Sequence, residues 1–424
     1  MTYEWEVSSL DNGLRVVTTS DPRAQSVSLT LVVRVGSRAE ERRTNGLTHY
    51  IEHMLFKGTT KRPDAIEISA AIEGAGGSLN AYTTKEVTAY WNHLPFDKMA
   101  LGMDVLADML TNSLLDQGEI DRERTVVQAE IRRSYDQPGA WAGELLSTAT
   151  YGDQPIGWPI AGTVESVGVL QRPDFVVHLT QWYRPANMVL SVGGNTTHDE
   201  VMTLAASLFG DIEPRETPTP LPARPLPRER SVVAEQRPIQ QCHLGLAMLG
   251  IARRDPDRHP LSILNTILGR GMSSRLFREV RERRGLAYSV GSGVSRYQDT
   301  GTVSVSAGVA PEKLEEATRV IVDELLRFTA EPVSEDELRR AKDFAIGSFR
   351  LGLETSRAIA RRAGEELLQT GEVEAIEQVV AGLEAVTPVE IERVAERLFQ
   401  PERFVIAVVG PQADEEALAR IISA

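Results

Sequence analysis

The chain has 424 residues, of which 42% are hydrophobic and 25% are charged, and its formal net charge is −14. This length exceeds one ordinary hydrophobic core and predicts about two to three domains of a globular protein. The acidic balance argues against nucleic acid as a partner, because phosphate binding needs a basic surface. No apolar run approaches the roughly 20 residues that span a bilayer, so we expect no membrane partner.

Two features bear on the cellular compartment. The start, MTYEWEVSSL, lacks a basic segment followed by an apolar one, so we expect no signal peptide. Cys242 is the one cysteine, which excludes an intrachain disulfide, and its apolar neighbours favour a buried thiol over a reactive one. Both features predict a reducing, cytoplasmic location.

The sequence shows no phosphate-binding loop, so we expect no requirement for ATP.

An alternating strand near residues 27–37 precedes a helix in NGLTHYIEHMLFKG. Asn45 is the expected N-cap of this helix and Gly58 its expected stop. Apolar residues at helical spacing predict one buried face, made of Leu47, Tyr50, Ile51, Met54 and Leu55. At roughly 100° per residue, the opposite face presents His49, Glu52 and His53 together.

This opposite face has the composition of a zinc site. Two histidines at i and i+4 can reach one metal ion, so His49 and His53 are candidate zinc ligands. Glu52 lies between them and suits a general base that takes a proton from zinc-bound water. The order His-x-x-Glu-His is the reverse of the commoner zinc-protease motif. A catalytic zinc also needs a third protein ligand and one open position.

The third ligand is expected in the segment 119–136, which has a helical pattern. It follows a strand at 88–95 and a helical pattern at 97–114. Glu123 and Glu130 occupy positions of this segment that should be apolar. A buried carboxylate must be paired or bound to metal, so Glu130 is a candidate zinc ligand and Glu123 a candidate partner that orients the site. The residues alone leave open the alternative that both carboxylates point to solvent.

A proline-rich segment divides the chain nearly in half. Residues 214–230 include Pro214, Pro218, Pro220, Pro222, Pro225 and Pro227. Proline fixes φ and removes a hydrogen-bond donor, so this segment is expected to be an extended, stiff linker. The sequence therefore predicts an N-terminal domain at 1–213, the linker at 214–230 and a C-terminal domain at 231–424.

The two halves resemble repeats of one another. QWYRPANMVLSVGGN at 181–195 aligns without a gap to RLFQPERFVIAVVGP at 397–411, and each is followed by a helical pattern. A second alternating strand and helix pair lies at 302–309 and 311–329. We therefore predict an α+β protein of two homologous domains, each a mostly antiparallel sheet packed with helices. The segment LSILNTILGR, where a second zinc motif would fall, has no ligands.

Three motifs resemble the pitrilysin family of zinc peptidases. They are GLTHYIEHMLFKGT, GGSLNAYTTKEVTAYW and ERTVVQAEIRRSYDQP, and the second half is similar through GRGMSSRLFREVRERRGLAYSVGS. The resemblance covers essentially the whole chain. Within this family, the chain resembles the two-domain branch, which includes mitochondrial processing peptidase subunits and bacterial processing-peptidase-like proteases.

The resemblance implies roles for further residues. Glu130 matches the third zinc ligand, and Glu123 matches the accessory catalytic glutamate. Asn80 and Ala81 match an edge strand to which the substrate adds as another β-strand. Arg281 and Tyr288 match a pair that holds the substrate backbone and stabilises the oxyanion. The residues alone instead predict that Arg281 lies on a solvated, arginine-rich face of a helix.

The resemblance also implies the activity. We expect a zinc-dependent endopeptidase that hydrolyses peptides or unfolded segments, with Zn2+ as cofactor and Glu52 as general base. The alternative is a non-catalytic or partner-dependent subunit of a heteromeric processing peptidase. Longer relatives carry four such domains, so we expect this chain to act as a homodimer, with a heterodimer as the alternative.

Overall fold

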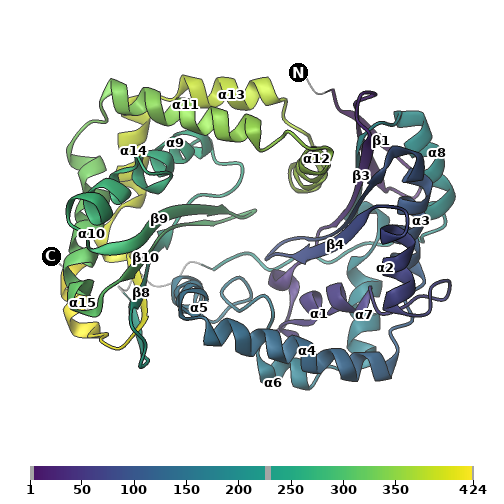
Figure 1. The fold of residues 1–424 in the computed structure, drawn as a ribbon, viewed down its shortest axis with the longest axis horizontal. Helices are drawn as coiled ribbons and strands as arrows, with labels where there is room; N and C mark the ends of the chain where they lie inside the picture. The colour runs from purple at the N-terminus through teal and green to yellow at the C-terminus, as the bar shows by residue number, and fades with distance from the viewer. Residues whose placement is uncertain (1–3, 225–230, 423–424) are drawn as a thin grey trace. The chain divides into compact units, whose positions relative to one another are not determined.

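The computed structural model describes residues 4–224 and 231–422, and these fall into two compact units (Figure 1). The first unit consists of the residues up to Arg132, Pro159–Leu221 and Arg350–Glu377. The second consists of Arg133–Trp158, Pro222–Phe349 and the residues from Gln378 onward. Both units mix strands and helices, which confirms the predicted α+β class.

The first unit is built on a six-stranded sheet with the order β1-β2-β6-β3-β5-β4. All neighbouring strands are antiparallel except β2 and β6, which are parallel. The strands are β1 (Glu6–Ser9), β2 (Arg15–Ser20), β3 (Ser26–Val33), β4 (Ser78–Thr83), β5 (Thr88–Pro95) and β6 (Met188–Gly194). The helices are α1 (Leu47–Met54), α2 (Ala65–Glu73), α3 (Met99–Thr111), α4 (Gln117–Asp136), α6 (Val164–Gly168), α7 (Arg172–Trp182), α8 (His198–Phe209) and α12 (Ser356–Thr370).

The second unit repeats this design in a five-stranded sheet with the order β7-β11-β8-β10-β9. Among its described strands β7 and β11 are parallel, and the other neighbouring strands are antiparallel. The strands are β7 (Ser231–Gln236), β8 (Cys242–Leu249), β9 (Ala287–Arg296), β10 (Gly301–Val309) and β11 (Val405–Gly410). The helices are α5 (Pro138–Tyr151), α9 (Arg258–Gly269), α10 (Leu314–Ala330), α11 (Glu335–Leu351), α13 (Ile376–Ala385), α14 (Pro388–Leu398) and α15 (Glu415–Ile421).

The two sheets confirm the predicted duplication. In chain order, β2, β3, β4, β5 and β6 take the same places in the first sheet as β7, β8, β9, β10 and β11 in the second. The aligned repeat segments form α7 with β6 and α14 with β11, each joined by a turn that begins with proline. A shared strand order with the same parallel pair indicates two homologous domains.

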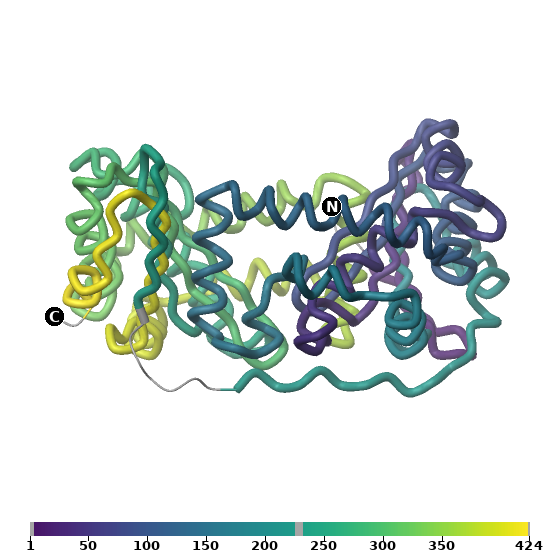
Figure 2. Tube along the Cα trace, turned by 90° about the horizontal axis from the view of Figure 1, so that it is seen from below, coloured from purple at the N-terminus to yellow at the C-terminus, as the bar shows by residue number. Residues whose placement is uncertain are grey.

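The compact units are discontinuous along the chain, unlike the contiguous division predicted from the sequence. Helix α5 follows α4 in the first half but packs on β8 and β11 of the second unit through Leu146, Ala247 and Ala407. Helix α12 lies in the second half but packs on β3 and β6 of the first unit. The colours of Figure 2 allow the chain to be followed into and out of α5 and α12. Each sheet therefore buries one face under a helix from the other half of the sequence.

The structure describes the predicted linker only as far as Arg224. Residues 213–224 form neither helix nor strand, as six prolines in 214–230 predict. Pro225 and Pro227 lie outside the described residues. Within the described ranges, none of the helices combines the length and apolar character that crossing a bilayer requires.

The core of the first unit lies between the sheet and the helices that carry the zinc motif. Strand β3 is buried on both faces, so Ser28 and Thr30 are buried along with its apolar residues. Leu29 and Leu31 face the main core, which includes residues of α1, α3, α7 and α8. Val32 points the other way and packs under α12 with Ala363 and Leu367.

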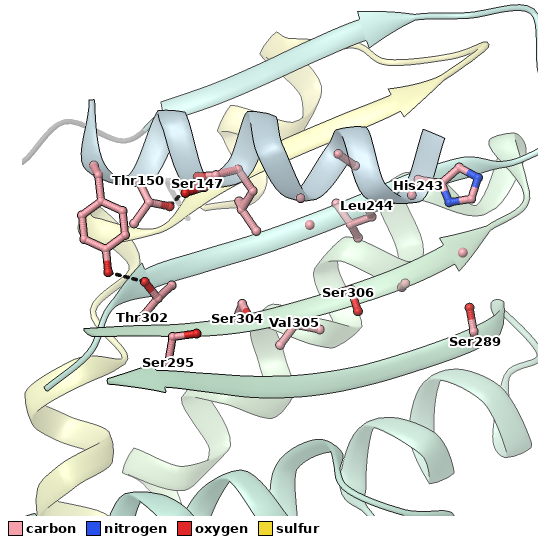
Figure 3. A pocket seen from close by; sticks show the side chains of 18 of the residues that line it. Ser147, Thr150, His243, Leu244, Ser289, Ser295, Thr302, Ser304, Val305 and Ser306 are labelled. Atoms are coloured by element: carbon pink, nitrogen blue, oxygen red, sulfur yellow. Dashed lines mark hydrogen bonds between the residues drawn. The ribbon is translucent and has the colours of Figure 1, made fainter. Parts of the chain in front are cut away.

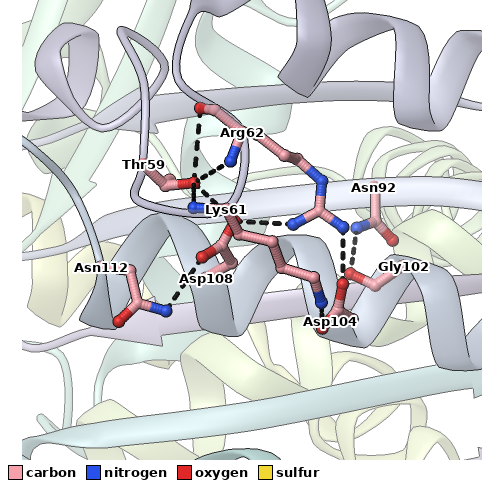
Figure 4. Close-up of polar contacts among 8 residues, drawn as sticks. All are labelled: Thr59, Lys61, Arg62, Asn92, Gly102, Asp104, Asp108 and Asn112. Carbon is pink, nitrogen blue, oxygen red and sulfur yellow. Dashed lines mark hydrogen bonds and ion pairs between the residues drawn. The ribbon is translucent and has the colours of Figure 1, made fainter.

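A buried polar cluster joins the loop after α1 to the segment that leads into α4 (Figure 4). Asp108 of α3 accepts hydrogen bonds from Thr59 and Arg62 at 2.6 Å each and from Asn112 at 2.9 Å. Arg62 also donates to Asp104 at 2.5 Å. The backbones of the two segments bond directly, from Leu114 N–H to the Gly58 carbonyl at 3.0 Å. The end of α1 and the start of α4 are therefore held to one another.

We predict that Arg62→Met lowers the free energy of unfolding by about 3 kcal/mol, because it leaves the buried Asp108 carboxylate without its cation. Denaturant-induced unfolding of the full chain measures this loss. The matched control is Arg215→Met, which removes an exposed ion pair with Glu213 and should cost less than about 1 kcal/mol. Equal effects of the two substitutions would contradict the structural role of the cluster.

Candidate active site

The zinc motif lies on α1 as the sequence predicts, but the helix is shorter and begins differently. It ends at Met54, before Gly58, and its N-cap is Gly46 rather than Asn45. Gly46 has φ 95°, and a Cβ there would lie 2.5 Å from the Ala161 carbonyl oxygen, so the position requires glycine. The buried face is as predicted, whereas His49, Glu52 and His53 are only partly buried.

Glu40 takes the capping role that the sequence suggested for Asn45. Its carboxylate accepts hydrogen bonds from the backbone N–H groups of Gly46 at 2.8 Å and Thr48 at 2.7 Å. The Asn45 side chain also donates to Glu40, at 3.0 Å. Burial outweighs these hydrogen bonds and raises the pKa of Glu40 to about 7. A carboxylate outside the helix therefore satisfies the free N–H groups at its N-terminus.

His49, His53 and Glu130 come together as the predicted ligand set. Nε2 of His49 lies 3.3 Å from Nε2 of His53. Oε2 of Glu130 lies 3.8 Å from the first of these nitrogens and 3.5 Å from the second. The His49 and His53 side chains are 18% and 17% exposed and Glu130 is 46% exposed, so the group is open on the glutamate side.

The spacing of these three atoms fits a tetrahedral zinc ion. Zinc binds imidazole nitrogen and carboxylate oxygen at about 2.0–2.2 Å, which places tetrahedral ligand atoms about 3.3–3.6 Å apart. The observed separations of 3.3, 3.5 and 3.8 Å lie at or just above this range. Two nitrogens and one oxygen are also the donor set of known catalytic zinc sites with an open fourth position.

Glu123 orients His53 from the other side of the ring. Its Oε1 lies 2.9 Å from His53 Nδ1, and its Oε2 lies 2.5 Å from the Lys57 ammonium. Burial by itself raises the pKa of Glu123, but the hydrogen bonds from His53 and Lys57 hold it below its usual range. An ionised Glu123 accepts the Nδ1 proton and leaves the Nε2 lone pair of His53 free for a metal. Glu123 is therefore buried, as its apolar position predicts, whereas Glu130 is exposed, so the expected burial is wrong for Glu130.

Glu52 is held by a residue that the sequence did not single out. The Thr83 hydroxyl at the end of β4 donates to Glu52 Oε2 at 2.5 Å. Burial raises the pKa of Glu52, and the Thr83 hydrogen bond opposes this effect. One carboxylate oxygen is thus fixed, and the other can serve as a proton acceptor.

The candidate substrate residues lie in both units. Asn80 and Ala81 are on β4, the edge strand of the first sheet, whose one partner among the described strands is β5. Arg281 and Tyr288 belong to the second unit, where the guanidinium lies 5.4 Å from the centre of the tyrosine ring. Tyr288 is 77% exposed on β9, another edge strand. The structure therefore pairs Arg281 with Tyr288 and leaves both accessible.

The second unit also holds a cavity of about 430 Å³ between α5 and the strands β8, β9 and β10 (Figure 3). Hydroxyl groups dominate its polar lining, and the Tyr151 hydroxyl lies 2.5 Å from that of Thr302. No carboxylate, thiol, lysine or arginine of the described chain lines it. His243 is the one histidine among the described residues that line it, so the cavity lacks the three protein ligands of a catalytic zinc site.

Two family models match the chain. The model described as Insulinase (Peptidase family M16) matches residues 15–164, and the model described as Peptidase M16 inactive domain matches residues 170–344. The chain belongs to peptidase family M16. The inactive-domain match includes α9, whose place beside β9 mirrors that of α1 beside β4 and whose sequence carries no zinc motif.

Relatives of the M16 chain carry zinc-protease names. An uncharacterized zinc protease of Streptomyces coelicolor is 37% identical over 416 residues, which cover 97% of this chain and 90% of the relative. An uncharacterized zinc protease of Bacillus subtilis is 32% identical over 403 residues, or 95% of this chain and 97% of the relative. A solved protease from Helicobacter pylori shares the fold, with a TM-score of 0.90 at 23% identity over 97% of this chain and 100% of that chain.

Glu40, Lys57 and Thr83 are the site residues that sequence reasoning missed. Each acts through a contact with a residue distant from it along the chain or across a turn, and none stands out by residue type. A signal existed for Glu40, because a helix that begins with Asn-Gly needs a carboxylate or hydroxyl near its first turn. The sequence offered no comparable signal for Thr83.

The raised pKa of Glu40 predicts a pH dependence of stability. A carboxyl group with a folded pKa of about 7 and an ordinary value of 4.5 stabilises the fold fully below about pH 4.5, and this contribution is lost as the pH rises through 7. Glu40→Gln cannot ionise and lacks this loss. Between pH 5 and pH 8, the variant should therefore gain stability relative to the parent, by about 1 to 3 kcal/mol.

Denaturant-induced unfolding of both proteins at several pH values measures this difference. The control is Glu73→Gln, at an exposed carboxylate at the end of α2, which should leave the pH profile of the parent unchanged. A constant difference between Glu40→Gln and the parent over this range would show that Glu40 is ionised throughout.

Proposed function

We propose that this M16 protein is a zinc-dependent endopeptidase that hydrolyses peptides or unfolded polypeptide segments. The observation that supports this most directly is the convergence of His49 Nε2, His53 Nε2 and Glu130 Oε2 at the separations of a tetrahedral zinc site. Glu52 lies on the same helix between the two histidines. The zinc-protease names of relatives that align along most of the chain agree with this proposal.

Zinc in this site would polarise the scissile carbonyl and lower the pKa of water. His49, His53 and Glu130 would hold the ion, and Glu123 would keep the His53 ring in the tautomer that binds it. Glu52 takes a proton from the attacking water on its free oxygen, while Thr83 holds the other oxygen in place. The same carboxyl group then gives the proton to the departing amine.

The edge strand β4 suits an extended substrate. Asn80 and Ala81 offer backbone groups to a chain that pairs alongside, which takes affinity from the peptide backbone and tolerates varied side chains. Thr83 ends the same strand and contacts Glu52, so the strand leads directly to the catalytic base. Most backbone groups of a folded domain are already bonded within it, whereas those of an unstructured peptide are free to pair, and we therefore propose that unstructured peptides are the preferred substrates.

Substitution of Glu52, the proposed general base, distinguishes its role in catalysis from metal binding. Glu52→Gln should retain about one zinc per chain and lose at least about 100-fold in kcat/KM, because the amide cannot accept the proton. Glu130→Gln should instead lose zinc, since a neutral amide is a poor ligand. Metal analysis and a fluorogenic-peptide assay on the purified chain measure both effects. An active Glu52→Gln protein would reject Glu52 as base, and a metal-bound but inactive parent would favour the non-catalytic alternative.

We also propose that the active form is a dimer of identical chains, in which Arg281 and Tyr288 of one chain assist the reaction of the other. Mixing tests this proposal. An inactive Glu52→Gln chain and an inactive chain with Arg281→Ala and Tyr288→Ala should together recover about a quarter of the parental activity, because half of the dimers then hold one intact combination. No recovery after demonstrated subunit exchange would reject this arrangement, and the same experiment with an unlike subunit present tests a heterodimer.

A further inference from the structure

We propose that Lys57 is a positioning residue for the metal site, which acts through Glu123 to fix the orientation of His53. This inference rests on the proposed zinc site. It assigns a role in metal binding to a lysine outside the His-x-x-Glu-His motif. Lys57 follows His53 by one helical turn, in the turn that continues α1 beyond Met54.

The contacts form a continuous chain from Lys57 to the metal ligand. The Lys57 ammonium lies 2.5 Å from Glu123 Oε2, and Glu123 Oε1 lies 2.9 Å from His53 Nδ1. Each oxygen of Glu123 therefore has its own donor. The Glu123 side chain is 8% exposed and that of Lys57 is 27% exposed, so the pair is largely shielded from water.

Burial makes the lysine necessary to this arrangement. A carboxylate in a shielded position is stable only when its oxygens are paired, and removal of one partner leaves an uncompensated charge. Without Lys57, Glu123 is free to rotate toward water and give up its bond to His53. The His53 ring then loses the contact that keeps Nδ1 protonated and Nε2 directed at Glu130.

The backbone around Lys57 holds it in position. Its N–H donates to the Met54 carbonyl at 3.1 Å, and the adjacent Gly58 carbonyl accepts from Leu114 at 3.0 Å. Gly58 has φ 124°, and a Cβ there would lie 2.4 Å from the Pro63 carbonyl oxygen, so the turn is tight. The cluster around Arg62 and Asp108 anchors the same loop. Lys57 is thus presented to α4 from a constrained turn.

Zinc affinity of the purified full chain tests the proposal. The dissociation constant for zinc is measured by competition with a chromophoric chelator at a fixed pH. Lys57→Met should bind zinc about 10- to 100-fold more weakly, the range found when partners of metal ligands are removed. Lys57→Arg keeps a cation at this position and should recover most of the affinity. The control, Lys98→Met, removes an exposed ion pair with Asp97 in the same unit and should bind zinc like the parent.

A double-mutant cycle distinguishes positioning through Glu123 from a general loss of stability. In a Glu123→Gln background the ion pair no longer exists, so Lys57→Met should weaken zinc binding no further. The inference is overturned if Lys57→Met binds zinc as tightly as the parent, or if it weakens binding equally with and without Glu123. If Lys57→Met does not fold, Lys57→Gln and the arginine variant provide the same comparison. Failure of the parent itself to bind zinc would instead reject the proposed function.

Discussion

The candidate metal site depends on the fixed approach of α4 to α1. Three side chains of α1 and the turn after it reach α4: Tyr50 donates to the Ile120 carbonyl, and His53 and Lys57 share the carboxylate of Glu123. The Arg62–Asp108 cluster holds the loop after α1 against the segment before α4. With both helices fixed in this way, Glu130 reaches the two histidines although it lies far along the chain. Ligands on rigid helices keep a metal site accurate.

Buried carboxylates are the second theme of the site. Glu40 caps the N-terminus of α1, Glu123 orients His53, and Asp108 anchors the loop beyond the helix. Each one receives at least two hydrogen bonds from donors placed by the fold, which offsets the cost of removing a carboxylate from water. Together they control the start, the ligand face and the end of the helix that carries the zinc motif. The catalytic candidate Glu52 has a hydroxyl partner instead, which leaves its other oxygen available.

The duplication shows how one fold can hold different chemistry in its two halves. Helices α1 and α9 take matching places beside β4 and β9, yet α9 buries leucine and isoleucine residues and has no zinc motif. Helices α12 and α5, which each cover the other face of their sheet, also pack differently. Helix α12 seals an apolar cluster on β3 and β6, whereas α5 covers only part of its sheet and leaves a hydroxyl-lined cavity. The two domains keep the same strand order although their side chains differ, because one fold can carry different functional side chains.

Local patterns in the sequence were sufficient for the fold class, the repeat, the helix that carries the zinc motif and the placing of His49 and His53 side by side on it. These properties follow from short-range periodicity, since the i, i+4 spacing alone places two imidazoles side by side on a helix. The sequence left open whether Glu123 and Glu130 face a metal or solvent, and only the packing of α4 against α1 decided that Glu123 is buried beside His53. Tertiary packing also decided that Glu40 caps α1, that Thr83 contacts Glu52 and that Lys57 pairs with Glu123. It likewise decided that α5 and α12 each pack in the unit formed mainly by the other half of the chain. Each of these joins residues that are not neighbours on one helical face or strand, so their meeting depends on how elements pack, which no local period encodes.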